Sequence, residues 1–99
     1  MNTIEIFGID ESQWRCPSCV TAKRICEEGQ VQYTFTGVIE RGEDGMPIFD
    51  VDQLRDIAER AGFKTLRITY PVIFINNELC RLKDFRQKLF DLGYDVDVF

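Results

Sequence analysis

Two cysteines one helical turn apart are the residues of this chain best suited to chemistry. They lie in the segment Cys16-Pro17-Ser18-Cys19. Proline is favoured at the first position of a helix, so Cys16 is expected to cap a helix and Cys19 to lie on the same face. The free N–H groups and the positive end of the helix dipole then favour the thiolate form of Cys16. We interpret the segment as a redox dithiol.

Positive charge is expected close to this dithiol in an otherwise acidic chain. The formal net charge is −5, but Arg15 directly precedes the first cysteine and Lys23 follows the second by about one turn. A neighbouring cation favours a thiolate. Trp14 is expected to line the rim of the site.

Three alternatives to a redox dithiol remain open. A Cys-x-x-Cys pair also forms half of many zinc and iron–sulfur sites, or a structural disulfide. The chain has no histidine and no second such pair, and its other thiols are Cys26 and Cys80. In the metal alternative Cys16 ligates a zinc ion or an iron–sulfur cluster, which two chains could share, and we assign no definite set of metal ligands. The third alternative is a binding module whose dithiol is redox-silent.

Length and composition limit the classes of protein further. With 99 residues, 44% of them apolar and 29% charged, residues 1–99 are expected to form one globular domain. The acidic charge argues against nucleic-acid or membrane binding, since both need a basic face, and the lack of histidine excludes a Ser–His or Cys–His hydrolase. We find no signal peptide or long apolar span and expect a monomer in the cytoplasm, where such a pair is more often catalytic or metal-binding than structural.

The first half of the chain has the pattern of a strand, a helix and a strand. Alternating apolar residues predict strands over 3–7 and 31–36, and the helix between them runs from the dithiol to about Glu28. Such a unit needs two parallel strands. The dithiol then lies at the carboxyl end of the first strand, where open α/β sheets place their chemistry. The polar segment 40–47 is predicted to be a surface loop.

The second half begins with a helix and returns to the sheet. Asp50 and Gln53 resemble a capping box, which predicts a helix over 51–61 that ends at Gly62. The β-rich segment 70–75 has its proline near the start, where a strand tolerates it. The Asn76-Asn77 pair predicts a tight turn.

The predicted chain then closes with a strand and a helix. An antiparallel strand is expected over 79–82, followed by a helix capped by Asp84 and closed by Gly93. Residues 94–99 are expected to form an edge strand or a loosely docked end. Cys26 and Cys80 are interpreted as buried core cysteines, with a regulatory or metal role for Cys26 and a redox role for Cys80 as the alternatives.

The order β-α-β-α-β-β-α, with a mixed four-stranded sheet flanked by helices, resembles the thioredoxin-like α/β fold, and within it the glutaredoxins. Cys16-Pro17-Ser18-Cys19 followed by Ala22-Lys23 is similar to their Cys-Pro-Tyr-Cys-x-x-Ala-Lys motif, and Thr69-Tyr70-Pro71 is similar to their Thr-Val-Pro. The small size and the polar insertion before the second helix are most similar to the phage glutaredoxins, also called phage thioredoxins.

The resemblance implies a dithiol–disulfide oxidoreductase that reduces protein disulfides, with ribonucleotide reductase as a candidate acceptor. Cys16 would attack the substrate and Cys19 would resolve the mixed disulfide. Glutathione or a thioredoxin reductase would supply electrons, with no tightly bound cofactor. Pro71 would be cis, and the backbone of Tyr70 would pair with an extended substrate. The implied substrate-binding residues are Arg15, Ser18, Thr69, Tyr70, Pro71 and Asp84.

Three departures from the family pattern bear on the substrate. Ser18 replaces an aromatic residue, and Gln13 stands where many relatives have lysine. The segment 80–84, Cys-Arg-Leu-Lys-Asp, replaces the Gly-Gly cradle that receives the γ-glutamyl end of glutathione. Glycine permits close backbone approach, so the loss of both glycines argues against glutathione use and leaves the electron donor open.

Overall fold

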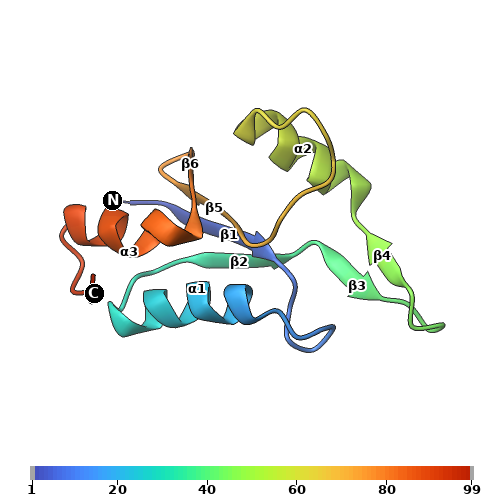
Figure 1. Ribbon diagram of the computed structural model, residues 1–99, viewed down its shortest axis with the longest axis horizontal. Coiled ribbons are helices and arrows are strands. Elements are labelled where there is room, and N and C mark those ends of the chain that lie inside the picture. The colour runs from blue at the N-terminus through green and yellow to red at the C-terminus, as the bar shows by residue number, and fades with distance from the viewer. Residues whose placement is uncertain (1, 99) are drawn as a thin grey trace.

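Four strands form the central sheet of the computed structural model, which describes residues 2–98 (Figure 1). Three helices and a separate two-stranded hairpin complete the chain. In chain order the elements are β1 (Ile4–Gly8), α1 (Pro17–Glu28), β2 (Thr34–Gly37), β3 (Ile39–Arg41), β4 (Pro47–Phe49), α2 (Val51–Ala61), β5 (Val72–Ile75), β6 (Glu78–Cys80) and α3 (Leu82–Asp91).

The central sheet is mixed, as predicted. Its order is β2-β1-β5-β6, in which β1 runs parallel to β2 and antiparallel to β5, and β6 is antiparallel to β5. Ile6 of β1 lies opposite Phe35 on one side and Ile73 on the other. The predicted βαβ unit is therefore present, and α1 begins beyond the carboxyl end of β1.

Side chains of β1 and β5 alternate between two apolar cores, because successive residues of a strand point to opposite faces. Ile73 and Ile75 belong to the core that includes residues of α1 and α3, whereas Val72 and Phe74 belong to the core that includes residues of α2. Figure 1 shows α2 separated by the sheet from α1. Burial on both faces explains why β5 is apolar throughout.

Local signals gave the correct ends for the first two helices. Cys16 is the N-cap of α1, with proline at the first position. Asp50 caps α2 and accepts a hydrogen bond from Gln53 N at 3.2 Å, and Gly62 ends it with φ +75°. The Asn76-Asn77 turn is also confirmed, since both residues have positive φ, 52° and 67°.

Several predicted boundaries were wrong. The segment 40–47 is not a plain loop, because Ile39 pairs with Phe49 and Arg41 with Pro47 in the β3–β4 hairpin. β2 begins at Thr34 instead of residue 31, since its pairing with β1 starts only at Glu5. The last strand is β6, Glu78–Cys80, and not residues 79–82.

The start of the last helix needs a second correction. Its N-cap is Arg81, which makes no side-chain capping hydrogen bond, and Asp84 lies within the first turn instead of capping it. Acidic residues are favoured both at the cap and in the first turn. The sequence signal was therefore real but displaced by three residues.

The segment that follows α3 is neither a strand nor loosely docked over residues 94–98. Val96 is buried in the apolar core that includes residues of α1 and α3, called here the α1–α3 core. Asp97 N donates a hydrogen bond to Glu28 Oε1 at 3.0 Å. This hydrogen bond, together with the Arg86 guanidinium, lowers the pKa of the Glu28 carboxyl. Residue 99 lies outside the described residues. No helix within residues 2–98 is both long and apolar enough to cross a membrane.

Candidate functional site

Cys16 and Cys19 are joined by a disulfide at the start of α1, with their Cα atoms 5.3 Å apart. That separation lies within the usual range for a disulfide. Cys16 is partly exposed, whereas Cys19 is 1% exposed. Cys16 is therefore the more accessible residue of the pair.

The sulfur of Cys16 caps the helix that it begins. Cys16 has extended backbone angles, φ −128° and ψ 92°, and its Sγ accepts a hydrogen bond from Cys19 N at 3.4 Å. A backbone N–H and the positive end of the helix dipole therefore face this sulfur. Both favour the thiolate over the thiol when the disulfide is reduced.

The two cations expected near the dithiol have different surroundings. Lys23 Nζ lies 3.9 Å from the centre of the Phe35 ring and within 4.0 Å of the carboxylates of Asp10 and Glu11. Its charge is therefore partly neutralised. Arg15 is exposed and makes no hydrogen bond or ion pair with residues 2–98, so it is the cation available to a substrate.

The pKa of the Asp10 carboxyl is lowered chiefly by the hydrogen bond from Ser12 N, at 2.9 Å. Lys23 contributes less to this shift. The turn between β1 and α1 thus favours the ionised form of Asp10, whose carboxylate lies 4.0 Å from Lys23 Nζ.

Gly8 allows the end of β1 to pack against the buried sulfur. A Cβ atom at this position would lie 2.8 Å from Cys19 Sγ, which is closer than such atoms can approach without a shift. Because Gly8 has no side chain, the sulfur of Cys19 can pack directly against the end of β1. Sequence reasoning missed this role, because nothing local distinguishes this glycine from one in a turn.

The loop before the dithiol is held by the β3–β4 hairpin. Gln13 Oε1 accepts a hydrogen bond from Arg41 N at 2.7 Å. The Arg41 guanidinium lies 4.8 Å from the centre of the Trp14 ring. Trp14 is half-buried and also packs against the apolar core that includes residues of α2. These contacts join positions far apart in the sequence, and no local signal marked Gln13 or Arg41 for them.

A groove of about 490 Å³ brings together four of the predicted substrate-binding residues, which are Ser18, Thr69, Tyr70 and Pro71. The Tyr70–Pro71 peptide bond is cis, as the resemblance implied. Arg15 and Asp84 do not line this groove. Three further lining residues, Cys80, Arg81 and Leu82, belong to the segment that replaces the glycine cradle. Sequence reasoning missed the remaining ones, which are Phe63, Val72 and Leu79.

Arg81 and Leu82 put side chains where the resemblance expects a glycine cradle. Both line the groove, and Leu82 also packs against the α1–α3 core. The Arg81 guanidinium makes no hydrogen bond or ion pair within the part of the chain that the structure describes. The groove is thus mainly apolar, with one available cation at its edge.

The other two cysteines are buried, as expected. Cys26 is fully buried, and its burial raises the pKa of the thiol to about 12. Burial also raises the pKa of Cys80, whose Sγ donates to the carbonyl of Arg81 at 3.5 Å. Within residues 2–98 no three cysteine, aspartate or glutamate side chains gather as a metal site would require.

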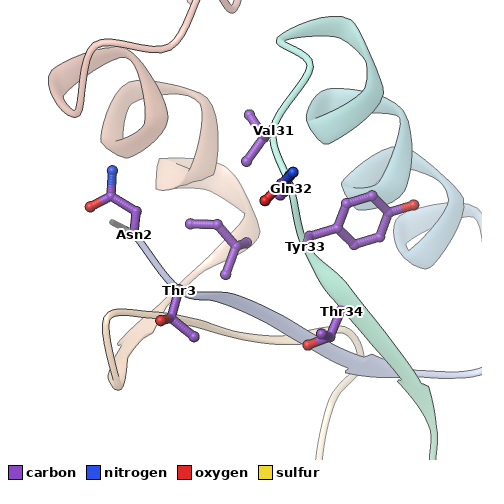
Figure 2. A pocket seen from close by; sticks show the side chains of 7 residues that line it. Asn2, Thr3, Val31, Gln32, Tyr33 and Thr34 are labelled. Atoms are coloured by element: carbon purple, nitrogen blue, oxygen red, sulfur yellow. The ribbon is translucent and has the colours of Figure 1, made fainter.

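A second hollow, of about 550 Å³, lies at the end of β1 and β2 that is away from the dithiol (Figure 2). Figure 2 shows it between the chain entering β1, at Asn2 and Thr3, and the chain entering β2, at Gln32 and Tyr33. Its lining holds amides, hydroxyls and apolar groups but none of the predicted site residues. This hollow is therefore separate from the dithiol and from the groove beside it.

Comparisons with known proteins were made for the whole chain. No protein-family profile matches it. It is 38% identical over 98 residues to an uncharacterized 11.8 kDa protein from the Gp55–nrdG intergenic region of Enterobacteria phage T4, covering 98% of this chain and 94% of that protein. Glutaredoxin 1 from Francisella tularensis, solved in complex with cacodylate, superposes with a TM-score of 0.62 at 21% identity, covering 92% of this chain and 99% of that one. This structural likeness confirms the thioredoxin-like fold.

The packing of Gly8 against Cys19 leads to a test of sulfur placement. Gly8→Ala should displace Cys19 Sγ, because the added methyl group would otherwise lie 2.8 Å from it. We expect disulfide closure between Cys16 and Cys19 to slow by roughly tenfold to hundredfold, measured as oxidation of the reduced protein by a small disulfide. Gly37→Ala is the control, since its Cβ would meet nothing closer than 3.8 Å; equal rates in both variants would contradict this role.

The burial of Cys26 and Cys80 predicts their reactivity. At about pH 8, an ordinary thiol is partly ionised, whereas Cys26, with a pKa of about 12, is almost fully protonated. The oxidised native protein should therefore resist iodoacetamide, and after denaturation it should take up label at two cysteines, Cys26 and Cys80. Mass spectrometry would count the labels. Rapid labelling of either cysteine in the native protein would show that its burial is not maintained in solution.

Proposed function

We propose that this chain, which belongs to the same family as the phage T4 protein and has the fold of a glutaredoxin, is a dithiol–disulfide oxidoreductase that reduces protein disulfides. The observation that carries the proposal is the cap on α1. Cys16 is partly exposed, and its sulfur accepts a hydrogen bond from Cys19 N at 3.4 Å. A thiolate nucleophile with a resolving thiol beside it is what disulfide reduction requires.

The reaction begins when the Cys16 thiolate attacks one sulfur of a substrate disulfide. The substrate S–S bond breaks, a mixed disulfide forms, and the other substrate sulfur leaves as a thiolate. Cys19 then loses its proton and attacks Cys16 Sγ, which releases the second substrate thiolate. The two substrate sulfurs take up protons from water. The substrate gains two electrons, and the protein ends with the Cys16–Cys19 disulfide.

The groove beside Ser18 is the proposed place for the substrate segment that flanks the reacting cysteine. Its walls, which include Tyr70 and Pro71, suit apolar side chains, and Thr69 and Ser18 add hydroxyl groups. Burial raises the pKa of the Tyr70 phenol, which therefore stays neutral. Arg15 is proposed to contact the substrate outside the groove. Asp84, in the first turn of α3, is likewise proposed to contact the substrate outside the groove.

The electron donor and the acceptor are parts of the proposal as well. The side chains of Arg81 and Leu82 fill the place of the glycine cradle, which favours a thioredoxin reductase over glutathione as the donor. Ribonucleotide reductase is proposed as an acceptor, and the position of the T4 relative beside nrdG fits this choice. We place this cycle in the cytoplasm, where reductants can regenerate the dithiol.

Replacement of each cysteine should separate the two steps. Cys16→Ser should abolish reduction of insulin disulfides, since no accessible thiolate remains. Cys19→Ser should still attack but not resolve, so it should accumulate a covalent complex with the substrate that dithiothreitol releases. Gel electrophoresis without reductant and a turbidity assay would record both results.

Cys26→Ser is the matched control for these variants, because it changes a thiol that lies in the core and away from any substrate. It should keep its turnover. Normal turnover by Cys19→Ser would remove the resolving role from Cys19. Activity that survives Cys16→Ser would place the nucleophile elsewhere.

The altered cradle predicts which donor supports turnover. We expect reduction of a protein disulfide with a bacterial thioredoxin reductase and NADPH, and little with glutathione and glutathione reductase. The variant Arg81→Gly/Leu82→Gly should gain glutathione-dependent turnover, since removal of both side chains restores close backbone approach. Lys83→Gly, next to these positions but not lining the groove, is the control. Rapid turnover of the unaltered protein with glutathione would contradict this explanation.

A further inference from the structure

The β3–β4 hairpin and the first residue of α2 expose large apolar side chains. Met46 is 62% exposed, Ile48 55%, Phe49 49% and Val51 44%. Figure 1 shows the hairpin projecting beyond the central sheet, next to the start of α2. An exposed apolar cluster of this kind usually marks a site of interaction with another molecule.

The same segment holds most of the net charge of the protein. Residues 40–52 have a net charge of −4, from five carboxylates and one guanidinium, whereas the whole chain has −5. The guanidinium, that of Arg41, lies against Trp14. The segment that holds the apolar cluster therefore has an excess of negative charge, which attracts a basic partner and repels an acidic one.

A small hollow on the hairpin combines both properties. It has a volume of about 150 Å³ and is lined by Gly37, Val38, Glu40, Ile48, Phe49 and Asp50. Glu40 and Ile48 lie directly opposite each other in the strand pairing. An apolar wall with carboxylates at its edge suits a lysine or arginine, whose side chain has an apolar stem and a charged end.

The hairpin is also tied to the loop that carries the dithiol. Arg41 of β3 donates its backbone N–H to Gln13 and stacks on Trp14. Trp14 lies two residues before Cys16. A partner bound on the hairpin would thus be held beside the loop that presents the reactive sulfur.

We propose that the face of the hairpin that carries Glu40 and Ile48, together with Glu43 and Met46 in the turn, is a docking surface for a disulfide-bearing protein partner. The partner's matching face is basic and apolar, and one of its lysine or arginine side chains enters the hollow beside Glu40. This inference rests on the proposed function, because it identifies the class of protein that the dithiol reduces. The hairpin supplies recognition, and the dithiol supplies the chemistry.

The test uses two synthetic disulfide-bonded peptides as probes. They share one cysteine loop, but one has a flanking segment of lysine, arginine and leucine, and the other has glutamate, aspartate and leucine. The reduced protein should reduce the basic peptide about tenfold faster at low ionic strength. The preference should fall at about 1 M salt, where charges are screened within a few ångströms. Rates come from acid-quenched samples separated by chromatography.

Variants then locate the preference on the hairpin. Glu40→Lys/Glu43→Lys should cancel or reverse it, and Ile48→Ser should slow reduction of the basic peptide. Glu27→Lys/Glu78→Lys is the matched control, since it changes the net charge equally on exposed residues of α1 and β6. If Glu27→Lys/Glu78→Lys removes the preference as fully as Glu40→Lys/Glu43→Lys does, net charge alone is responsible. That result would overturn the docking surface.

Reduction of hydroxyethyl disulfide separates this inference from the proposed function. The hairpin variants should reduce this small molecule normally, since it is too small to span the hairpin and the dithiol. Equal rates for both peptides, with this activity intact, would overturn the docking surface alone. If the unaltered protein reduces none of the three disulfides, both the function and the docking surface are wrong. A dimer that Ile48→Ser dissociates in sedimentation experiments would assign the surface to a second copy of the chain, also against the proposal.

Discussion

The hydrogen bond from Cys19 N to the sulfur of Cys16 is the contact on which the site depends. It exists because α1 begins at Pro17, so that Cys16 has extended backbone angles and its sulfur takes the place of a capping oxygen. The same helix start buries Cys19 against Gly8 at the end of β1. One local event, the beginning of a helix, thus produces an accessible sulfur with a stabilised thiolate and a buried sulfur beside it.

Everything else in the fold keeps that helix start in place. β1 has neighbours on both sides, and its residues contribute to both apolar cores, so its carboxyl end has little freedom. α1 is fixed by Ala22, Ile25 and Cys26, which lie in the α1–α3 core. Cys26 serves this packing, and its raised pKa is a consequence of its burial and not a sign of reactivity. Of the four cysteines, only Cys16 combines partial exposure with a position at the start of a helix.

The features that could be predicted from the sequence are those that nearby residues determine. The capped helices at Cys16 and Asp50 and the turn at Asn76 follow from contacts within a few positions, and the Tyr70-Pro71 motif correctly indicated a wall of the groove. The hairpin could not be predicted, because Ile39 and Phe49 pair across a polar segment that by itself looks like a loop. The contacts of Gln13 with Arg41 and of Gly8 with Cys19 were missed for the same reason. Asp84 was misplaced because a cap and a first turn favour the same residue type.

The two surfaces near the dithiol differ in a way that bears on specificity. The groove is apolar and has the guanidinium of Arg81 at its edge, whereas the hairpin is apolar and acidic. A glycine cradle recognises a small reductant through close backbone contact, and side chains occupy that place here. Recognition by side chains on two separate surfaces requires a ligand that is large enough to touch both. A folded protein meets that condition and a tripeptide does not, so the side chains of Arg81 and Leu82 and those of the acidic hairpin both favour a protein as the bound molecule.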